Sequence, residues 1–128
     1  MKASDICVGD WVNYSILNLK AKVFSVLGNH TIGIQFVDKN NKVEAIHGLL
    51  EEAINPIPLT EEILVKNGFK KESQTIDGDY CKYTLSGFVL NWCDTDGFWY
   101  QNGDITPNHV HTLQHLLRLC GVEKELII

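Results

Sequence analysis

Arginine is nearly absent from this chain, which has a single one, Arg118, among 128 residues. Eleven Lys and Arg residues stand against sixteen Asp and Glu, so the net charge is -5 at pH 7. Neither half is basic, because residues 1–59 contain five basic and six acidic residues and residues 60–128 contain six and ten. Arginine is the preferred reader of phosphates and guanine edges, so a groove that follows a nucleic-acid backbone is disfavoured.

Long hydrophobic runs and a secretion leader are also missing. No stretch approaches the ~18 apolar residues of a membrane span, and the opening MKASDICVGDWV lacks the apolar core of a signal peptide. The four cysteines (Cys7, Cys81, Cys93 and Cys120) lie far apart and form no Cys-x-x-Cys pair. We therefore expect a cytoplasmic protein with no membrane partner, whose reduced thiols mostly serve as small buried hydrophobes.

Familiar catalytic and cofactor motifs are absent as well. The sequence has no glycine-rich phosphate loop and no nucleophile-elbow serine, and we expect no cofactor. The stretch DTDG (94–97) shares letters with a calcium loop but lacks its continuation, so it predicts a hairpin turn. A nucleophilic pair of Cys81 or Cys93 with a histidine has no local signature to support it.

The first 59 residues have the pattern of short strands separated by turns. Strands are predicted over 10–16, 21–27, 31–37 and 42–48, and 54–59 is predicted to close the sheet as an edge segment because its prolines cannot donate hydrogen bonds. In 31–37, Ile32, Ile34 and Phe36 alternate with small or polar residues, which buries one face. This pattern predicts a small SH3-like β-barrel over residues 1–59.

The pattern changes after Leu59. Thr60 as N-cap and Gly68 as stop predict a helix over 61–68. Strands are predicted over 80–85, 87–93 and 98–101, with 77–79 in a loop. A second helix is predicted to begin at Pro107, with Thr106 as its N-cap, and to stop at Gly121. The expected fold class is α+β: the barrel, then over 60–128 a three- or four-stranded antiparallel sheet with two helices on one face, the two parts packed as one unit.

The second predicted helix carries three histidines in HVHTLQHLLRLCG (109–121). On a helical projection the leucines, Val110 and Cys120 form an apolar face, and His111 and His115 lie opposite it. These two imidazoles are one turn apart, a spacing that suits a shared metal ion. No third ligand is near in sequence and Arg118 follows on the same face. The pattern favours an amphipathic packing helix, with a metal site at His111 and His115 as the alternative.

The hairpin of the second part defines a candidate binding surface. If the turn pairs Cys93 with Phe98, Trp92 faces Trp99 on one side of the sheet, and the helix is expected to cover that side. A bulged turn would shift the register by one residue and exchange the faces. The other side, half apolar with polar tips like many partner-binding surfaces, then carries four candidate binding residues: Val89, Asn91, Phe98 and Tyr100.

Three stretches carry a resemblance: NPIPLTEEILVKNGFKK (55–71), HVHTLQHLLRLCGVEKELII (109–128) and the opening MKASDICVGDWVNY. They resemble a family of short uncharacterised proteins from gut anaerobic bacteria and their phages or mobile elements. Val110-His111 and Leu113-Gln114 match a pattern in that family's last helix, whereas Arg118 and Cys120 depart from it. The family has no assigned activity, so the resemblance implies a source and implies that His111 matters beyond its helical position.

These features together predict a non-enzymatic protein interaction or assembly module. It would be derived from a phage or mobile element and would bind a protein partner or a second copy through the barrel rim or the 89–100 sheet face. The alternative is a small metal- or thiol-dependent enzyme that uses His111, His115 and a cysteine. A third possibility, nucleic-acid binding through the barrel, is disfavoured by the charge.

Overall fold

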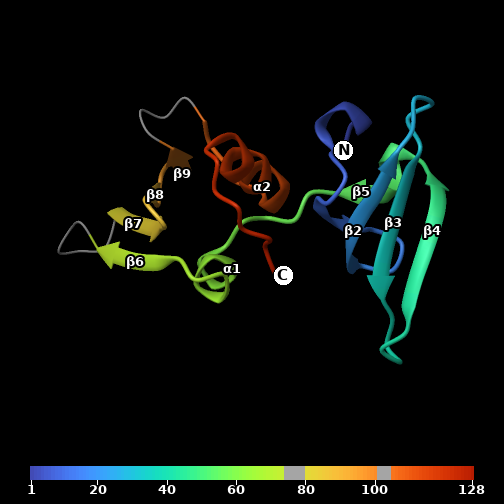
Figure 1. Ribbon diagram of the computed structural model, residues 1–128, viewed down its shortest axis with the longest axis horizontal. Helices are drawn as coiled ribbons and strands as arrows, with labels where there is room; N and C mark the ends of the chain where they lie inside the picture. The colour runs from blue at the N-terminus through green and yellow to red at the C-terminus, as the bar shows by residue number, and fades with distance from the viewer. Residues whose placement is uncertain (74–79, 101–104) are drawn as a thin grey trace. The chain divides into compact units, whose positions relative to one another are not determined.

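The computed structural model describes residues 1–73, 80–100 and 105–128, which form two compact units, Met1–Ile57 and Pro58–Ile128. Each unit contains one antiparallel sheet, and the second also carries the two α-helices of the described chain (Figure 1). The protein is therefore α+β, as expected. The predicted loop 77–79 and the end of the last predicted strand, Gln101, lie outside the described residues. Neither helix is long and apolar enough to span a membrane.

The sheet of the first unit has five strands in the order β4-β3-β2-β1-β5. Pairing stops at β4 and β5, so the sheet is not closed and the predicted SH3-like barrel is not confirmed. The edge strand β5 is only two residues long, and the proline that follows it has no N–H with which to extend the ladder. The strands are β1 (Trp11–Tyr14), β2 (Leu19–Val26), β3 (Ile32–Val37), β4 (Val43–Leu49) and β5 (Ile54–Asn55).

One face of this sheet forms the core of the first unit. Ile32, Ile34 and Phe36 of β3 are buried, as their alternation predicts, and they pack with side chains from β1, β2 and β5. The opposite face carries an aromatic contact at a bulge in β2, where the ring of Phe24 lies over Gly33 and meets His47 at 4.9 Å. A Cβ at Gly33 would lie 2.7 Å from that ring, so only glycine leaves room for it.

The sheet of the second unit has four strands in the order β6-β7-β8-β9. Ser86 and Gly87 both have positive φ and close the two-residue turn between β7 and β8, as a type I′ hairpin requires. The sheet therefore has four strands, the larger of the two predicted numbers. The strands are β6 (Lys70–Ser73), β7 (Tyr80–Leu85), β8 (Phe88–Cys93) and β9 (Gly97–Tyr100).

The first helix, α1 (Glu61–Lys66), begins where the sequence predicts and ends two residues earlier. The hydroxyl of Thr60 accepts a hydrogen bond from the backbone N–H of Ile63 at 3.3 Å, which satisfies one of the free donors of the first turn. The helix ends at Asn67, whose side chain is 1% exposed. The Asn67 amide donates to the carbonyls of Ile63 and Ile127, both at 2.8 Å, and its oxygen accepts from the Ile127 N–H at 2.7 Å. The chain near Ile127 is thereby fixed against the end of α1.

The second helix, α2 (Val110–Leu119), begins three residues later than predicted, with His109 rather than Thr106 as its N-cap. The segment before the helix is extended, because the carbonyls of Ile105 and Asn108 accept hydrogen bonds from residues outside the helix. Ile105 accepts a hydrogen bond from the Tyr100 N–H, and Asn108 accepts one from the Leu59 N–H, both at 2.9 Å. The predicted start at Pro107 is therefore wrong. Both helices lie on the same side of the sheet in Figure 1, where Leu64, Leu113, Leu116 and Leu117 are buried.

Candidate functional site

The register of the β8–β9 hairpin decides which side chains share a face of the second sheet. Cys93 pairs with Gly97, Trp92 with Phe98 and Leu90 with Tyr100. The predicted pairing of Cys93 with Phe98 is therefore wrong. Gly97 has a φ of +72° and closes a three-residue loop, which is the usual place for glycine in such hairpins. Every side chain of β9 consequently lies on the face opposite to the one expected.

Two of the four candidate binding residues lie on the side of the sheet that carries the helices, called the helix side below. Phe98 is 6% exposed and its ring lies 6.0 Å from that of Tyr83. Tyr100 stacks on Phe88 with ring centroids 5.1 Å apart, and its hydroxyl accepts a hydrogen bond from the Cys120 thiol at 3.4 Å. Phe98 and Tyr100 therefore pack inside the unit and do not share a face with Val89 and Asn91.

Val89 and Asn91 lie on the other side, together with Trp99. The Tyr80 hydroxyl donates a 2.7 Å hydrogen bond to Oδ1 of Asn91, and the Tyr80 ring lies 5.5 Å from that of Trp99. Asn91 is 9% exposed, and its amide nitrogen has no hydrogen-bond partner among the described residues. Tyr80, Lys82, Val89 and Trp99 around it are partly exposed. This side is called the open face of the second sheet, and the residues of it that surround Asn91 are Tyr80, Lys82, Val89 and Trp99.

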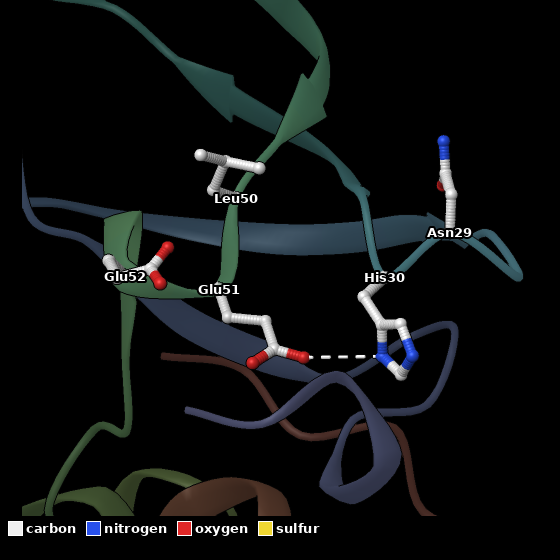
Figure 2. Close-up of a pocket in the computed structure, with 5 residues that line it drawn as sticks. All are labelled: Asn29, His30, Leu50, Glu51 and Glu52. Atoms are coloured by element: carbon white, nitrogen blue, oxygen red, sulfur yellow. Dashed lines mark ion pairs between the residues drawn. The ribbon is translucent and has the colours of Figure 1, made fainter.

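A pocket of about 410 Å³ lies in the first unit and is called the first pocket. Figure 2 shows the side chains of His30 and Glu51 pointing toward each other in it, with His30 Nδ1 3.4 Å from Glu51 Oε1. The same Glu51 oxygen accepts a hydrogen bond from the Ala3 N–H at 2.9 Å, and Oδ1 of Asn29 accepts one from the Thr31 hydroxyl at 2.7 Å. These polar groups already have partners within the unit. The lining residues are Asn29, His30, Leu50, Glu51 and Glu52.

A second pocket, of about 360 Å³, lies on the helix side of the second sheet. Tyr83 and Cys81 are 2% and 3% exposed and form its deep wall. At its rim, Lys71 Nζ and Glu61 Oε1 form an ion pair at 2.8 Å, with the two side chains 42% and 49% exposed. The second pocket is lined by Leu59, Thr60, Glu61, Lys71, Cys81, Tyr83, Trp92 and Phe98.

The electrostatics of the second pocket keep its tyrosine protonated. Burial raises the pKa of the Tyr83 hydroxyl, and the negative charge of Glu61 raises it further, while Lys71 opposes this. The hydrogen bond to Glu61 raises the pKa of Lys71 in turn, so the rim pair stays charged. At neutral pH Tyr83 is therefore a hydroxyl donor, and it has no hydrogen-bond partner among the described residues.

The three histidines near α2 lie close together. The ring of His111 stacks on that of His109 at 5.8 Å and meets that of His115 edge-on at 5.7 Å. The predicted exposure of His111 is wrong, because it is 9% exposed. Among the described residues, no group of three His, Cys, Asp or Glu donor atoms within 4.8 Å of one another contains both His111 and His115. The metal alternative stays a prediction that metal analysis of the purified protein would test.

The cysteines that the enzyme alternative would use have different surroundings. Cys81 lines the second pocket, and Cys120 donates to the Tyr100 hydroxyl. Cys93 lies at the β8–β9 loop, where its sulfur accepts a hydrogen bond from the Asp96 N–H at 3.3 Å. Of these thiols, only that of Cys81 belongs to a described pocket.

Comparison with known proteins identifies no relative of this chain. No known protein family, no curated protein and no solved structure matches the chain. The features of the described chain that bear on function are the open face and the two pockets. Sequence reasoning missed Tyr80 and Tyr83, and it placed Trp99 on the outer side only in the alternative of a bulged turn, which is the register observed. Gly97 as the closing residue of a three-residue loop was the signal that would have placed Trp99 correctly.

Proposed function

We propose that this protein is a non-enzymatic interaction module that binds a protein partner through the open face of the second sheet. The observation that carries the proposal is the Asn91 side chain, 9% exposed, with its oxygen fixed by Tyr80 and its amide nitrogen without a described partner. A nearly buried amide donor gains most when an incoming acceptor completes its hydrogen bonds. A backbone carbonyl of a partner protein is such an acceptor.

The surroundings of Asn91 support a protein as the occupant. Tyr80 and Trp99 contact each other beside it, and aromatic side chains supply much of the contact area in protein interfaces. Val89 extends the apolar part, and Lys82 pairs with Asn91 across the strands. A polar group surrounded by aromatic and aliphatic area resembles the centre of an interface more than an ordinary solvated sheet face.

A partner other than a second copy is favoured by charge. Two copies with a net charge of -5 each repel one another, whereas a basic or neutral partner is not repelled. Self-association is the competing outcome, and sedimentation velocity of the purified chain over a concentration series separates the two. A single monomeric species at all concentrations is expected.

The partner test uses a photo-crosslinking amino acid at Val89, with the same residue at Leu119 as control, because Leu119 is 83% exposed and lies on α2. A protein crosslinked from Val89 only is then purified, and its affinity for Trp99→Ala and Leu119→Ala is measured. We expect Trp99→Ala to weaken binding tenfold or more, and Leu119→Ala to leave it unchanged. Equal affinities for the two variants and the wild type would refute the proposal.

The source, the compartment and the barrel belong to the same proposal. The resemblance to short proteins of gut anaerobes and their phages or mobile elements supports the source. Four free cysteines support a reducing cytoplasm, and thiol titration of protein purified without reductant checks this. An SH3-like arrangement of the first unit is supported by the pairing of β1 with both β2 and β5.

One observation favours a second candidate, nucleic-acid binding through the first sheet. The face opposite its core carries Trp11 with Lys22 at 5.5 Å from the ring, the Phe24–His47 contact, and Lys20, and its strand positions contain no acidic residue. Stacking aromatics beside lysines are the usual elements of single-strand binding. Fluorescence anisotropy with a poly-thymidine oligonucleotide at low and high salt tests this, with Phe24→Ala as the variant. No binding at low salt would exclude it.

A further inference from the structure

A second site of a different kind is present on the helix side of the same sheet. The second pocket is lined by Leu59 and Thr60 just before α1, by the first residue of α1, and by side chains of β6, β7, β8 and β9. Its volume of about 360 Å³ is at the lower end of the range found for small-molecule sites, which is roughly 300–1,000 Å³. The pocket therefore has room for a small molecule and not for a folded segment of another protein.

The chemistry of the walls limits what that molecule can be. Two aromatic side chains, Trp92 and Phe98, lie opposite each other on neighbouring strands as a cross-strand pair. They provide flat apolar surface, which favours a planar ring. Lys71 and Glu61 at the rim neutralise one another at 2.8 Å, so the mouth of the pocket selects neither cations nor anions.

The Tyr83 hydroxyl is the group in this pocket that points to a ligand. Tyr83 is 2% exposed, it lines the pocket, and its hydroxyl makes no hydrogen bond to any described residue. The hydroxyl is not among the side-chain atoms that are both fully buried and unpartnered, so it is open to the pocket, where a ligand oxygen can accept its hydrogen bond in place of water. Its neutral form persists at physiological pH, because burial and Glu61 raise its pKa.

We infer that the second pocket binds a small, uncharged planar molecule that accepts a hydrogen bond from Tyr83 through an oxygen atom. The ring of the ligand lies against Trp92 and Phe98, and its carbonyl or ether oxygen faces the Tyr83 hydroxyl. The inference is independent of the proposed protein interaction, because the open face and the second pocket lie on opposite sides of the sheet.

Two matched probes test the inference on the full chain. Acetophenone has a planar ring with a carbonyl oxygen, and α-methylstyrene has the same shape with a CH₂ group in place of that oxygen. Binding is measured from the shifts of backbone amide signals by NMR. We expect acetophenone to bind at millimolar concentration, to shift signals of β7 and β8, and to bind about fivefold more tightly than α-methylstyrene, which is the ratio that one net hydrogen bond supplies.

The variants separate the hydroxyl from the pocket. Tyr83→Phe removes the hydroxyl alone and is expected to abolish the preference for acetophenone while both probes still bind. Tyr100→Phe makes the same change on the same side of the sheet outside the pocket, and is expected to keep the preference. Acetophenone should also slow alkylation of Cys81, which lines the pocket, and leave alkylation of the exposed Cys7 unchanged. Failure of both probes to bind, equal affinity of the wild type for the two, or an unchanged ratio in Tyr83→Phe would overturn the inference.

Discussion

The two pockets are of similar size, about 410 Å³ and 360 Å³, but they differ in whether their polar groups have hydrogen-bond or ion-pair partners. In the first pocket, Glu51 accepts from Ala3 and pairs with His30, and Asn29 accepts from Thr31. In the second, the Tyr83 hydroxyl has no partner among the described residues and is open to the pocket. Polar groups that are already paired within the unit have less to offer a ligand than a hydroxyl that faces the pocket without a described partner.

The two pockets also differ in how exposed their lining side chains are to water. In the first pocket His30 is 71% exposed and Glu51 32% exposed, so water screens their interaction. The second pocket has a wall of buried side chains. A hydrogen bond made there is screened less by water and is therefore stronger than one in the first pocket. We therefore interpret the first pocket as a structural hollow and the second as a binding site. The following predictions test that distinction, in order of decreasing expected effect.

The largest effect is expected from Leu117→Ala, because Leu117 is one of the fully buried side chains of the second unit. Leu117 is 1% exposed, so the truncation removes buried apolar area and leaves a cavity, at a cost of roughly 2–5 kcal/mol. Urea unfolding followed by tryptophan fluorescence measures it, with the 83% exposed Leu119→Ala as control. A midpoint equal to that of the wild type would mean that α2 does not pack on this sheet as described.

Tyr100→Glu is expected to destabilise the second unit by roughly 2–3 kcal/mol, because it places a charge where a ring stacks on Phe88. Trp99→Glu, one residue earlier on the open face, should cost about 1 kcal/mol or less because the carboxylate can reach water. Circular dichroism melting curves of the two variants compare the two sides directly. The reverse order of stability would show that the assigned hairpin register is wrong.

Glu51→Ala should cost about 1 kcal/mol, since it removes the acceptor for the Ala3 N–H and a partly exposed ion pair. Glu52→Ala at the same pocket is the matched control and should change the free energy of unfolding by less than about 0.5 kcal/mol. Hydrogen exchange of the first unit, read by mass spectrometry, localises the change. Protection of the first pocket by either aromatic probe would contradict its interpretation as a structural hollow.

The smallest effect is expected from Tyr83→Phe, which should change the free energy of unfolding by no more than about 0.5 kcal/mol near neutral pH, because no described hydrogen bond is lost. The raised pKa of Tyr83 means that its neutral form is favoured by folding. This contribution is present below the ordinary tyrosine pKa of 10.0 and is lost as pH rises above it. The variant should therefore lose less stability between pH 9 and about pH 11 than the wild type does. A large loss of stability at neutral pH would show that the hydroxyl already has a structural role.

Much of the fold follows from local sequence signals. Thr60 and Gly68 bracket α1, and the alternation of Ile32, Ile34 and Phe36 identifies the buried face of β3. Such signals act within a few residues, so they can be recognised without knowledge of the tertiary structure. The start of α2 at Val110 could not be predicted in the same way, because backbone pairing of Leu59 with Asn108, far apart in sequence, holds the preceding segment extended.

The candidate site was less predictable than the fold. Val89 and Asn91 are on the open face, but a one-residue difference in the hairpin register moved Phe98 and Tyr100 to the helix side. A single loop residue thus decides which aromatics are exposed, since side chains alternate along a strand. The second pocket could not be predicted at all, because its walls come from segments that meet only after folding.

The hydrogen bonds between Asn67 and Ile127 affect when the second unit can complete its folding during synthesis. Its side chain is satisfied only when Ile127, sixty residues later, has been made and has reached α1. The first unit uses residues up to Ile57 and can fold while the second is still emerging from the ribosome, as is usual for successive units. Until Ile127 leaves the exit tunnel, the Asn67 side chain has only the Ile63 carbonyl as a partner and lacks both hydrogen bonds to Ile127. In a nascent chain the second unit should therefore remain open to proteases and chaperones after the first unit has become resistant.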